Sequence, residues 1–241
     1  MNIYLITGAS KGIGFELAKQ LSEAGHFVVG IARTESEIDG VKFIQADLSE
    51  TGKLVSLMSE AIDSAPHDAS SFTLINNAGM VNPIGLIGSV NADEIANAIA
   101  VNLTAPMIIS NAFISNLKNF DGSKRIVNIS SGAGRNAYEG WGTYCSTKAG
   151  LDHFSRVVAM EQLNAEHPVE IVSIAPGIID TGMQETIRGS NENAFPLLEK
   201  FVDYKEQGLL STAEQTAQKL ISFIDNQDFK EVGPIVDIRN F

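Results

Sequence analysis

The sequence predicts an α/β fold, a doubly wound domain in which one parallel sheet of seven strands carries helices on both faces. Short β-branched runs alternate with longer stretches in which apolar residues recur at helical spacing. Strict alternation of strand and helix is typical of parallel pairing through right-handed crossovers. No linker rich in Pro, Gly or Ser divides the 241 residues, so we expect one domain over residues 1–241.

The strands are bounded by glycine, proline or short polar segments, and apolar residues at helical spacing separate them, as in Leu54-Leu57-Met58-Ala61-Ile62. In chain order the strand candidates are Ile3–Thr7, Phe27–Ala32, Lys42–Ala46, Phe72–Asn76, Arg125–Ser130, Val169–Ala175 and Ile235–Ile238.

The segment of residues 182–211 does not fit this alternation. Charged residues, Gly189, Pro196 and Gly208 interrupt short apolar groups such as Phe195-Leu197-Leu198. A connection of about 30 residues is too long for an ordinary loop, and connections of that length often cover a binding site. We therefore expect a helical substrate lid over residues 182–211.

The charge balance excludes several classes of partner. The chain has 17 Lys and Arg against 29 Asp and Glu, a net charge of −12, which disfavours nucleic acids and anionic membranes as partners. One cysteine, Cys145, cannot form an internal disulfide, so the chain does not need an oxidising compartment. We find no leader pattern and expect no membrane-spanning stretch of uncharged apolar residues, which predicts a cytoplasmic protein.

A glycine-rich turn follows the first strand and opens a helix. Its sequence is Thr7-Gly8-Ala9-Ser10-Lys11-Gly12-Ile13-Gly14. Glycines let a pyrophosphate approach the backbone, and the amides at the start of the helix favour its negative charge. This context indicates a Rossmann-type dinucleotide site. The residues expected to contact the cofactor here are Gly8, Ser10, Lys11, Gly12, Ile13 and Gly14.

The second strand indicates which dinucleotide is bound. A carboxylate about 20 residues after the glycine turn usually accepts hydrogen bonds from the ribose of NAD. Here the strand ends at Ala32 and Arg33 follows. Arg33 and Lys11 are cations where a 2′-phosphate would lie, so we expect the cofactor to be NADP(H).

Several motifs together resemble the short-chain dehydrogenase/reductase family. The resemblance implies a nicotinamide-dependent oxidoreductase that interconverts C=O and CH–OH, assembled as a homodimer or homotetramer. The matching motifs run from residue 7 to 181: Thr7–Gly14, Asn76-Asn77-Ala78-Gly79, Asn102, Ile129-Ser130-Ser131, Tyr144-Cys145-Ser146-Thr147-Lys148, and Pro176-Gly177 with Thr181.

Tyr144 and Lys148 are four residues apart, so on a helix they share one face. An ammonium at that spacing is expected to lower the pKa of the phenol toward the range useful in acid–base chemistry. The resemblance implies that Tyr144 protonates the substrate oxygen and that Ser131 polarises the carbonyl. It also implies that Lys148 holds the nicotinamide ribose and that Asn102 sustains a water relay.

The resemblance implies further cofactor contacts. Asp47 and Leu48, after the third strand, are expected beside the adenine, although Asp47-Leu48-Ser49 suits a helix N-cap equally well. The four histidines show no spacing typical of metal ligands, and we expect no metal. The remaining expected cofactor residues are Asn76, Ala78, Gly79, Tyr144, Lys148, Pro176, Gly177, Ile179 and Thr181.

Local features suggest the substrate. Trp141 lies three residues before Tyr144, and the segment of residues 175–184 is similar to that of a subgroup containing sepiapterin reductases and bacterial benzil reductases. This implies reduction of an aromatic 1,2-dicarbonyl compound, with Ser131, Trp141, Tyr144 and Met183 against the substrate. Asp237 falls where sepiapterin reductases carry a pterin-binding carboxylate, so pterin reduction is the alternative.

Two further alternatives are kept. A 3-oxoacyl carrier-protein reductase shares the whole catalytic set, but a net charge of −12 disfavours docking of an acidic carrier. A binding module that senses NADP without turnover would be expected to lack Ser131, Tyr144 or Lys148.

For Cys145 we expect a packing role. The residues expected at an interface between subunits are Ile95, Ile99, Leu151, Phe154 and Val158.

Overall fold

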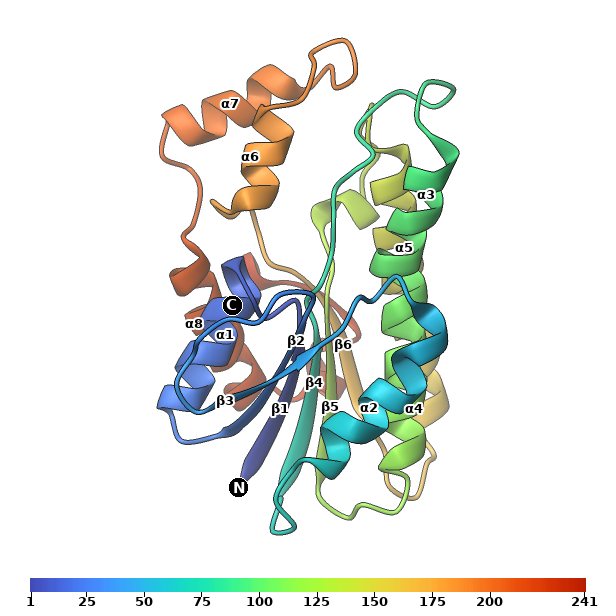
Figure 1. Cartoon of the computed structure of the whole chain (residues 1–241), viewed down its shortest axis with the longest axis vertical. Coiled ribbons are helices and arrows are strands. Elements are labelled where there is room, and N and C mark those ends of the chain that lie inside the picture. Colours follow the sequence, from blue (N-terminus) through green and yellow to red (C-terminus); the bar gives the residue numbers. More distant parts are fainter.

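A computed structural model describes residues 1–241 and contains the expected three layers, with one parallel seven-stranded sheet between two layers of helices (Figure 1). The sheet order is β3-β2-β1-β4-β5-β6-β7. Every predicted strand is present, with ends displaced by at most two residues. The strands are β1 (Asn2–Thr7), β2 (Phe27–Ala32), β3 (Val41–Gln45), β4 (Ser71–Asn76), β5 (Ser123–Ile129), β6 (Glu170–Ala175) and β7 (Ile235–Asp237).

Helices cover both faces of the sheet. On one face lie α1 (Gly12–Glu23) and α8 (Ala213–Asn226), and on the other lie α2, α4 and α5 (Figure 1). The remaining bounds are α2 (Leu54–Asp63), α3 (Ala92–Ile99), a π-helical segment η2 (Ala100–Thr104), α4 (Ala105–Asn116), α5 (Gly142–Gln162), α6 (Gly182–Arg188), α7 (Leu198–Glu206) and α9 (Phe229–Val232), with 3₁₀ segments η1 (Thr51–Lys53), η3 (Gly132–Gly134) and η4 (Ile238–Asn240).

Two hydrophobic cores fill the spaces between these layers. In β1, Ile3 and Leu5 belong to the core beneath α2, α4 and α5, whereas Tyr4 and Ile6 belong to the core beneath α1 and α8. Because successive side chains of a strand point to opposite faces, a strand covered on both faces needs a continuous apolar run. This explains why the central strands read as unbroken hydrophobic segments in the sequence.

Asparagines tie the centre of the sheet to the helices. Asn76 donates to Asn128 Oδ1 over 2.8 Å and to Ser110 Oγ over 3.1 Å, and Asn128 donates in turn to Ser155 Oγ over 2.9 Å. All four side chains are buried. Since buried polar groups need partners, the chain of bonds specifies how β4 and β5 align with α4 and α5.

The segment Ala92–Asn116 corrects one sequence expectation. It forms a continuous helix from α3 through η2 to α4, and by length and composition it is apolar enough to cross a membrane. The expectation that no such stretch exists was therefore wrong. A core helix of a globular protein meets the same criteria. In this helix, α3 and η2 pack against α5, and α4 packs against α2.

The expected interface residues divide between core and surface. Leu151 and Val158 are buried in the chain's own core, because that face of α5 packs on the sheet. They are therefore unavailable to a partner, and Phe154 packs partly against the same core. Ile99 is exposed. Other exposed apolar residues on α4 and α5, or just beyond α5, are Met107, Val157, Met160 and Leu163. The oligomeric state stays a prediction.

Residues 182–211 are largely helical, and α6 and α7 stand above the carboxyl ends of the strands (Figure 1). Backbone hydrogen bonds join the two ends of this segment: Asp180 N donates to Ser211 O over 2.9 Å, and Ser211 N donates to Ile178 O over 3.0 Å. A role as a lid stays a prediction, as does the assignment of residues 1–241 to one domain.

Gly14 lies where the glycine turn packs on itself. A Cβ at this position would lie 2.3 Å from Gly8 O and 2.4 Å from Asn77 Nδ2, closer than atoms can approach. By contrast, a Cβ at Gly52 would meet nothing within 4 Å. Gly14 is therefore required by packing and Gly52 is not.

We predict that Gly14→Ala lowers the free energy of unfolding by about 1–3 kcal/mol, because the added methyl overpacks the turn. Gly52→Ala is the matched control, and it should leave stability unchanged or raise it by up to about 1 kcal/mol. Urea unfolding of both variants provides the measurement. Equal stability of Gly14→Ala and the wild type would contradict the packing argument.

Candidate active site

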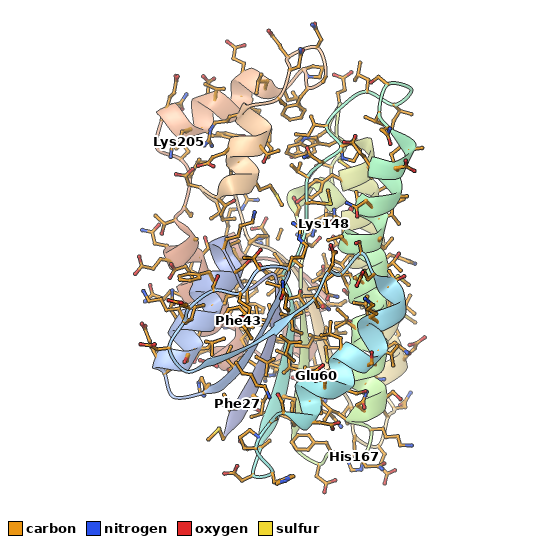
Figure 2. All side chains as sticks on the ribbon, in the orientation of Figure 1. Phe27, Phe43, Glu60, Lys148, His167 and Lys205 are labelled. Carbon is orange, nitrogen blue, oxygen red and sulfur yellow. The ribbon has the colours of Figure 1, made fainter.

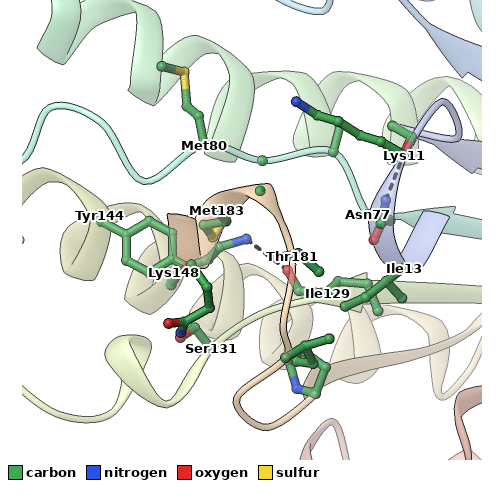
Figure 3. Close-up of a pocket in the computed structure, with 18 of the residues that line it drawn as sticks. Lys11, Ile13, Asn77, Met80, Ile129, Ser131, Tyr144, Lys148, Thr181 and Met183 are labelled. Carbon is green, nitrogen blue, oxygen red and sulfur yellow. Dashed lines mark hydrogen bonds between the residues drawn. The ribbon is translucent and has the colours of Figure 1, made fainter. Parts of the chain in front are cut away.

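A cleft of about 750 Å³ opens at the carboxyl ends of the strands. The strand order reverses between β1 and β4, and the loops that follow these two strands form adjacent walls of the cleft. In open parallel sheets the crevice at such a reversal is the usual ligand site. The cleft is within the size range of small-molecule and cofactor sites, and Figure 3 shows part of its lining.

Asn77 locks the glycine turn against the loop after β4. Its side-chain Nδ2 donates to Thr7 O over 3.0 Å and to Gly8 O over 3.2 Å. In return, Thr7 Oγ1 accepts from Asn77 N and Ala78 N, both over 3.1 Å. A Cβ at Gly8 would lie 2.8 Å from Ala78 Cα, and its φ of +69° favours glycine. The turn is thereby held open toward the cleft (Figure 3).

This arrangement corrects the expectation for Asn76. Asn76 points into the buried asparagine network and does not line the cleft, whereas Asn77, which sequence reasoning passed over, does. The two residues follow each other at the end of a strand, so their side chains point in different directions.

One end of the cleft carries exposed cations. Lys11 and Arg33 both line it, and Thr34 and Ser36, which the sequence did not single out, lie beside them. Asp47 also lines the cleft, but its Oδ1 accepts from Ser49 N over 2.9 Å and Ser49 Oγ over 2.8 Å. These bonds, with Arg33 nearby, hold the pKa of Asp47 below its usual value. The first helical turn begins at Thr51, so Asp47 is not a helix N-cap.

Tyr144 and Lys148 share one face of α5, as their spacing predicts. The Lys148 Nζ lies 5.8 Å from the centre of the Tyr144 ring and donates to Ile129 O over 2.8 Å, at the end of β5 (Figures 2 and 3). Ser131, two residues after β5, begins a 3₁₀ turn, and its Oγ accepts from Ala133 N over 3.1 Å. All three side chains line the same cleft.

The pKa of Tyr144 differs from the sequence expectation. Burial raises it to about 12, and the Ser131 hydroxyl opposes this rise only in part. The expected lowering by Lys148 is therefore wrong for this arrangement. The physical reason is that the ammonium is itself buried, and burial lowers the pKa of Lys148 to about 8. Both groups are pushed toward their neutral forms.

Asp152 supplies the countercharge for Lys148 from one turn further along α5, and it raises the lysine pKa against burial. Its buried carboxylate accepts from Ser173 Oγ over 2.6 Å and from Arg135 Nε over 3.1 Å. Arg135 also donates to Val236 O over 2.9 Å, which connects α5 to β6 and β7. Sequence reasoning missed Asp152, although its spacing of four from Lys148 was a usable signal.

Asn102 lies behind the cleft wall and is fully buried in the π-helical segment. Its Oδ1 accepts from Met80 N over 2.9 Å, and its Nδ2 donates to Met80 O over 2.8 Å and Thr147 Oγ1 over 3.3 Å. A Cβ at Gly79 would lie 3.4 Å from Asn102 Oδ1 and 3.6 Å from Lys148 Nζ. The Asn102 side chain thus holds the Gly79-Met80 wall against α5.

An aromatic cluster forms the other end of the cleft. Trp141 stacks on Phe195 with ring centres 4.9 Å apart and planes 9° apart, and its ring centre is 5.1 Å from that of Phe201. It also meets the Tyr144 ring edge to face at 5.5 Å. Phe195 and Phe201 come from residues 182–211, so this segment is anchored beside Tyr144. The buried Trp141 Nε1 has no hydrogen-bond partner.

Asp237 does not line the cleft, contrary to its expected contact with substrate. Its carboxylate accepts from Arg239 Nε over 2.8 Å and Arg239 Nη2 over 2.6 Å. This pairing lowers the pKa of Asp237. The neighbouring Arg239 lines the cleft instead, because it follows Asp237 in a 3₁₀ turn that the sequence did not predict.

The structure therefore brings most of the predicted site together in one cleft. The exceptions are Gly14, Asn76, Asn102 and Asp237, which support the wall from behind. Lining residues that sequence reasoning missed include Asn77, Met80, Tyr138, Lys200, Phe201, Tyr204 and Arg239. Those predicted residues that line it are Gly8, Ser10, Lys11, Gly12, Ile13, Arg33, Asp47, Leu48, Ala78, Gly79, Ser131, Trp141, Tyr144, Lys148, Pro176, Gly177, Ile179, Thr181 and Met183.

Comparison with known proteins finds similarity along the whole chain. Residues 2–192 match the family described as short chain dehydrogenase. The chain is 40% identical to a benzil reductase ((S)-benzoin forming) of Bacillus subtilis, with 100% of both chains covered. It is 30% identical to sepiapterin reductase of Rattus norvegicus, covering 98% of this chain and 95% of that one. The crystal structure of KRED1-Pglu enzyme superposes with a TM-score of 0.85 at 27% identity, covering 98% of this chain and 100% of that one.

The buried Lys148 predicts a pH dependence of stability. Its pKa is about 8 in the folded protein against an ordinary 10.5, so between these values the unfolded chain binds more protons. The free energy of unfolding should therefore gain about 3 kcal/mol from this group as the pH rises through that window.

Urea unfolding of the wild type and Lys148→Met across this window tests the prediction. Lys148→Met should lack the gain, whereas Lys19→Met, which removes an exposed lysine of α1, should retain it. The burial argument is wrong if all three proteins show the same dependence on pH.

Proposed function

Because the chain belongs to the short-chain dehydrogenase family, we propose that it is an NADPH-dependent carbonyl reductase acting on aromatic 1,2-dicarbonyl compounds. Family membership makes it a nicotinamide-dependent oxidoreductase that acts on C=O or CH–OH groups. The observation that carries the finer proposal is the contact of Trp141 with Tyr144, because it places a flat aromatic surface beside the phenol at the reacting position.

The cleft suits a nicotinamide dinucleotide. A side chain at Gly8 would fill the space against Ala78, and Gly12 has a φ of +58°, so the backbone is bare where a pyrophosphate would lie. Exposed Lys11 and Arg33 support binding of a 2′-phosphate. The neighbouring Asp47 is held by Ser49, which is unlike a carboxylate free to accept from a ribose hydroxyl. When bound, NADPH would supply the hydride.

Tyr144, Lys148 and Ser131 carry the proton chemistry in this proposal. A pKa of about 12 keeps the Tyr144 phenol protonated at neutral pH, which is the form that donates to the substrate oxygen. The charged Lys148 stabilises the phenolate left behind, and Ser131 orients the carbonyl. Asn102 acts as a positioning residue, since its amide holds Met80 and Thr147 rather than substrate.

The relatives and the aromatic cluster support the substrate class. The relative with 40% identity is named for reduction of benzil, a diketone between two aromatic rings. A pterin substrate is less well supported, because the carboxylate expected to anchor it, Asp237, pairs with Arg239. The intact set of Ser131, Tyr144 and Lys148 supports turnover rather than cofactor sensing alone. A 3-oxoacyl carrier-protein substrate is disfavoured by the net charge of −12.

Residues 182–211 act as a lid in this proposal. Ring contacts of Phe195 and Phe201 with Trp141 attach them to the loop before α5, beside the phenol. A closed segment of this kind excludes water from the reacting carbonyl.

We predict that Tyr144→Phe lowers kcat/KM for benzil by about 100- to 10,000-fold, because it removes the proton donor. The assay measures the rate of NADPH oxidation at neutral pH by the loss of NADPH absorbance. Tyr4→Phe removes a hydroxyl from the core far from the cleft and should retain activity. Activity of Tyr144→Phe near that of Tyr4→Phe would contradict the assignment.

We further predict a preference for NADPH over NADH that depends on Arg33. Arg33→Gln should raise KM for NADPH about tenfold and change KM for NADH little, because only NADPH carries the 2′-phosphate. Lys19→Gln serves as a charge-matched control on α1, outside the cleft. The cofactor proposal fails if the wild type uses both cofactors with equal kcat/KM.

A further inference from the structure

The charges that line the cleft are opposite in sign to those of the whole chain. The chain carries a net charge of −12, but the lining contains five cations and one carboxylate. The proposed function uses three of these cations, since Lys11 and Arg33 face the cofactor phosphate and Lys148 lies beside Tyr144. Lys200 and Arg239, toward the lid, have no role in it.

Lys200 differs from the other cations of the lid. Arg188 and Lys205 share one carboxylate, that of Asp180, and neither of them lines the cleft. Lys200 forms no ion pair, lies exposed on α7, and is the lysine of that helix that lines the cleft. Its Nζ lies 5.8 Å from the centre of the Tyr204 ring, one turn further along the helix, which directs the ammonium along the aromatic wall.

Arg239 is oriented by its own neighbours. Asp237 accepts from its Nε and Nη2, which uses two of the five N–H groups of a guanidinium and leaves three as donors. A Cβ at Gly177 would contact the Arg239 stem at 3.9 Å, so the side chain crosses the loop after β6 toward the cleft. The pairing with Asp237, together with the nearby phenols of Tyr138 and Tyr204, raises the pKa of Arg239.

From these contacts we propose that the lid end of the cleft is an anion subsite, formed by Lys200 and Arg239 with the hydroxyls of Tyr138 and Tyr204. The substrate class is then an aromatic 1,2-dicarbonyl that bears a carboxylate on a ring. This inference rests on the proposed function and narrows it. Asp237 serves the subsite by holding Arg239 in place and does not bind the substrate itself.

The aromatic wall places the carboxylate away from the reacting carbonyl. Ring centres lead from Tyr144 to Trp141 over 5.5 Å, to Phe201 over 5.1 Å and to Tyr204 over 5.7 Å. Lys200 follows at the end of this series, 5.8 Å from the Tyr204 ring centre, so three ring contacts separate the phenol from this ammonium. We therefore place the carboxylate on the far side of an aromatic ring rather than on the reacting carbon.

Three substrates that differ in one group test the subsite: benzil, 4-carboxybenzil and the methyl ester of 4-carboxybenzil. The ester matches the acid in shape but has no charge. We expect the acid to have a kcat/KM about tenfold above that of the ester, mainly through a lower KM, because charge-assisted hydrogen bonds form to the carboxylate. The ratio should fall as salt is added, since both cations are partly exposed.

Variants assign that ratio to residues. Lys200→Gln and Arg239→Gln should each bring the ratio of acid to ester toward one. Lys205→Gln removes a charge from the same helix outside the cleft, and it should keep the wild-type ratio. A ratio that falls equally in all three variants would indicate general attraction to the lid and would overturn the subsite. An Arg239→Gln effect on KM for NADPH alone would assign Arg239 to the cofactor instead.

The outcomes separate the subsite from the proposed function. Reduction of benzil and the ester with no preference for the acid overturns the subsite and leaves the function intact. If none of the three is reduced, the proposed function fails, and binding then decides the subsite. Biphenyl-4-carboxylate and its amide can be titrated against the fluorescence of Trp141, the single tryptophan. Tighter binding of the carboxylate, lost in Lys200→Gln, supports the subsite, and equal binding of both compounds overturns it.

Discussion

The buried ammonium of Lys148 connects the fold to the chemistry of the site. It is held by Ile129 O at the end of β5 and by the countercharge of Asp152 one turn away. Asp152 in turn is bonded to Ser173 of β6 and to Arg135. A charge removed from water needs such partners, so α5 has only one depth and rotation at which it can pack on the sheet. Tyr144 and Trp141 are placed by that same helix.

Burial moves the pKa values of Tyr144 and Lys148 in opposite directions. It raises the pKa of Tyr144 from 10.0 to about 12 and lowers that of Lys148 from 10.5 to about 8, so Lys148 becomes the more acidic of the two groups. At neutral pH the phenol keeps its proton and the ammonium keeps its charge. The pair thus carries a transferable proton next to a stabilising cation without either group being exposed to water.

Residues behind the cleft are as important to its shape as those that line it. Asn102 holds Met80, and Gly14 lets the glycine turn pack closely on Gly8 and Asn77. Asn77 does both, since it lines the cleft and its side chain holds the glycine turn. At the other end of the cleft, Trp141 contacts both Tyr144 and the aromatic residues of 182–211. One aromatic cluster therefore anchors residues 182–211 and lines the cleft, which couples the position of this segment to the surroundings of the phenol.

The sequence by itself determined where the seven strands lie along the chain. Short apolar runs located all of them, because buried parallel strands tolerate few polar residues. Local sequence also identified the glycine turn and the pair of Tyr144 and Lys148, since residues that are four apart on a helix share a face. Only the tertiary structure decided which of Asn76 and Asn77 faces the cleft, that Arg239 rather than Asp237 lines it, and that Tyr144 has a raised pKa. Those outcomes depend on burial and on partners far apart in the chain, such as Asn128 for Asn76 and Gly177 for Arg239, and no local pattern encodes them.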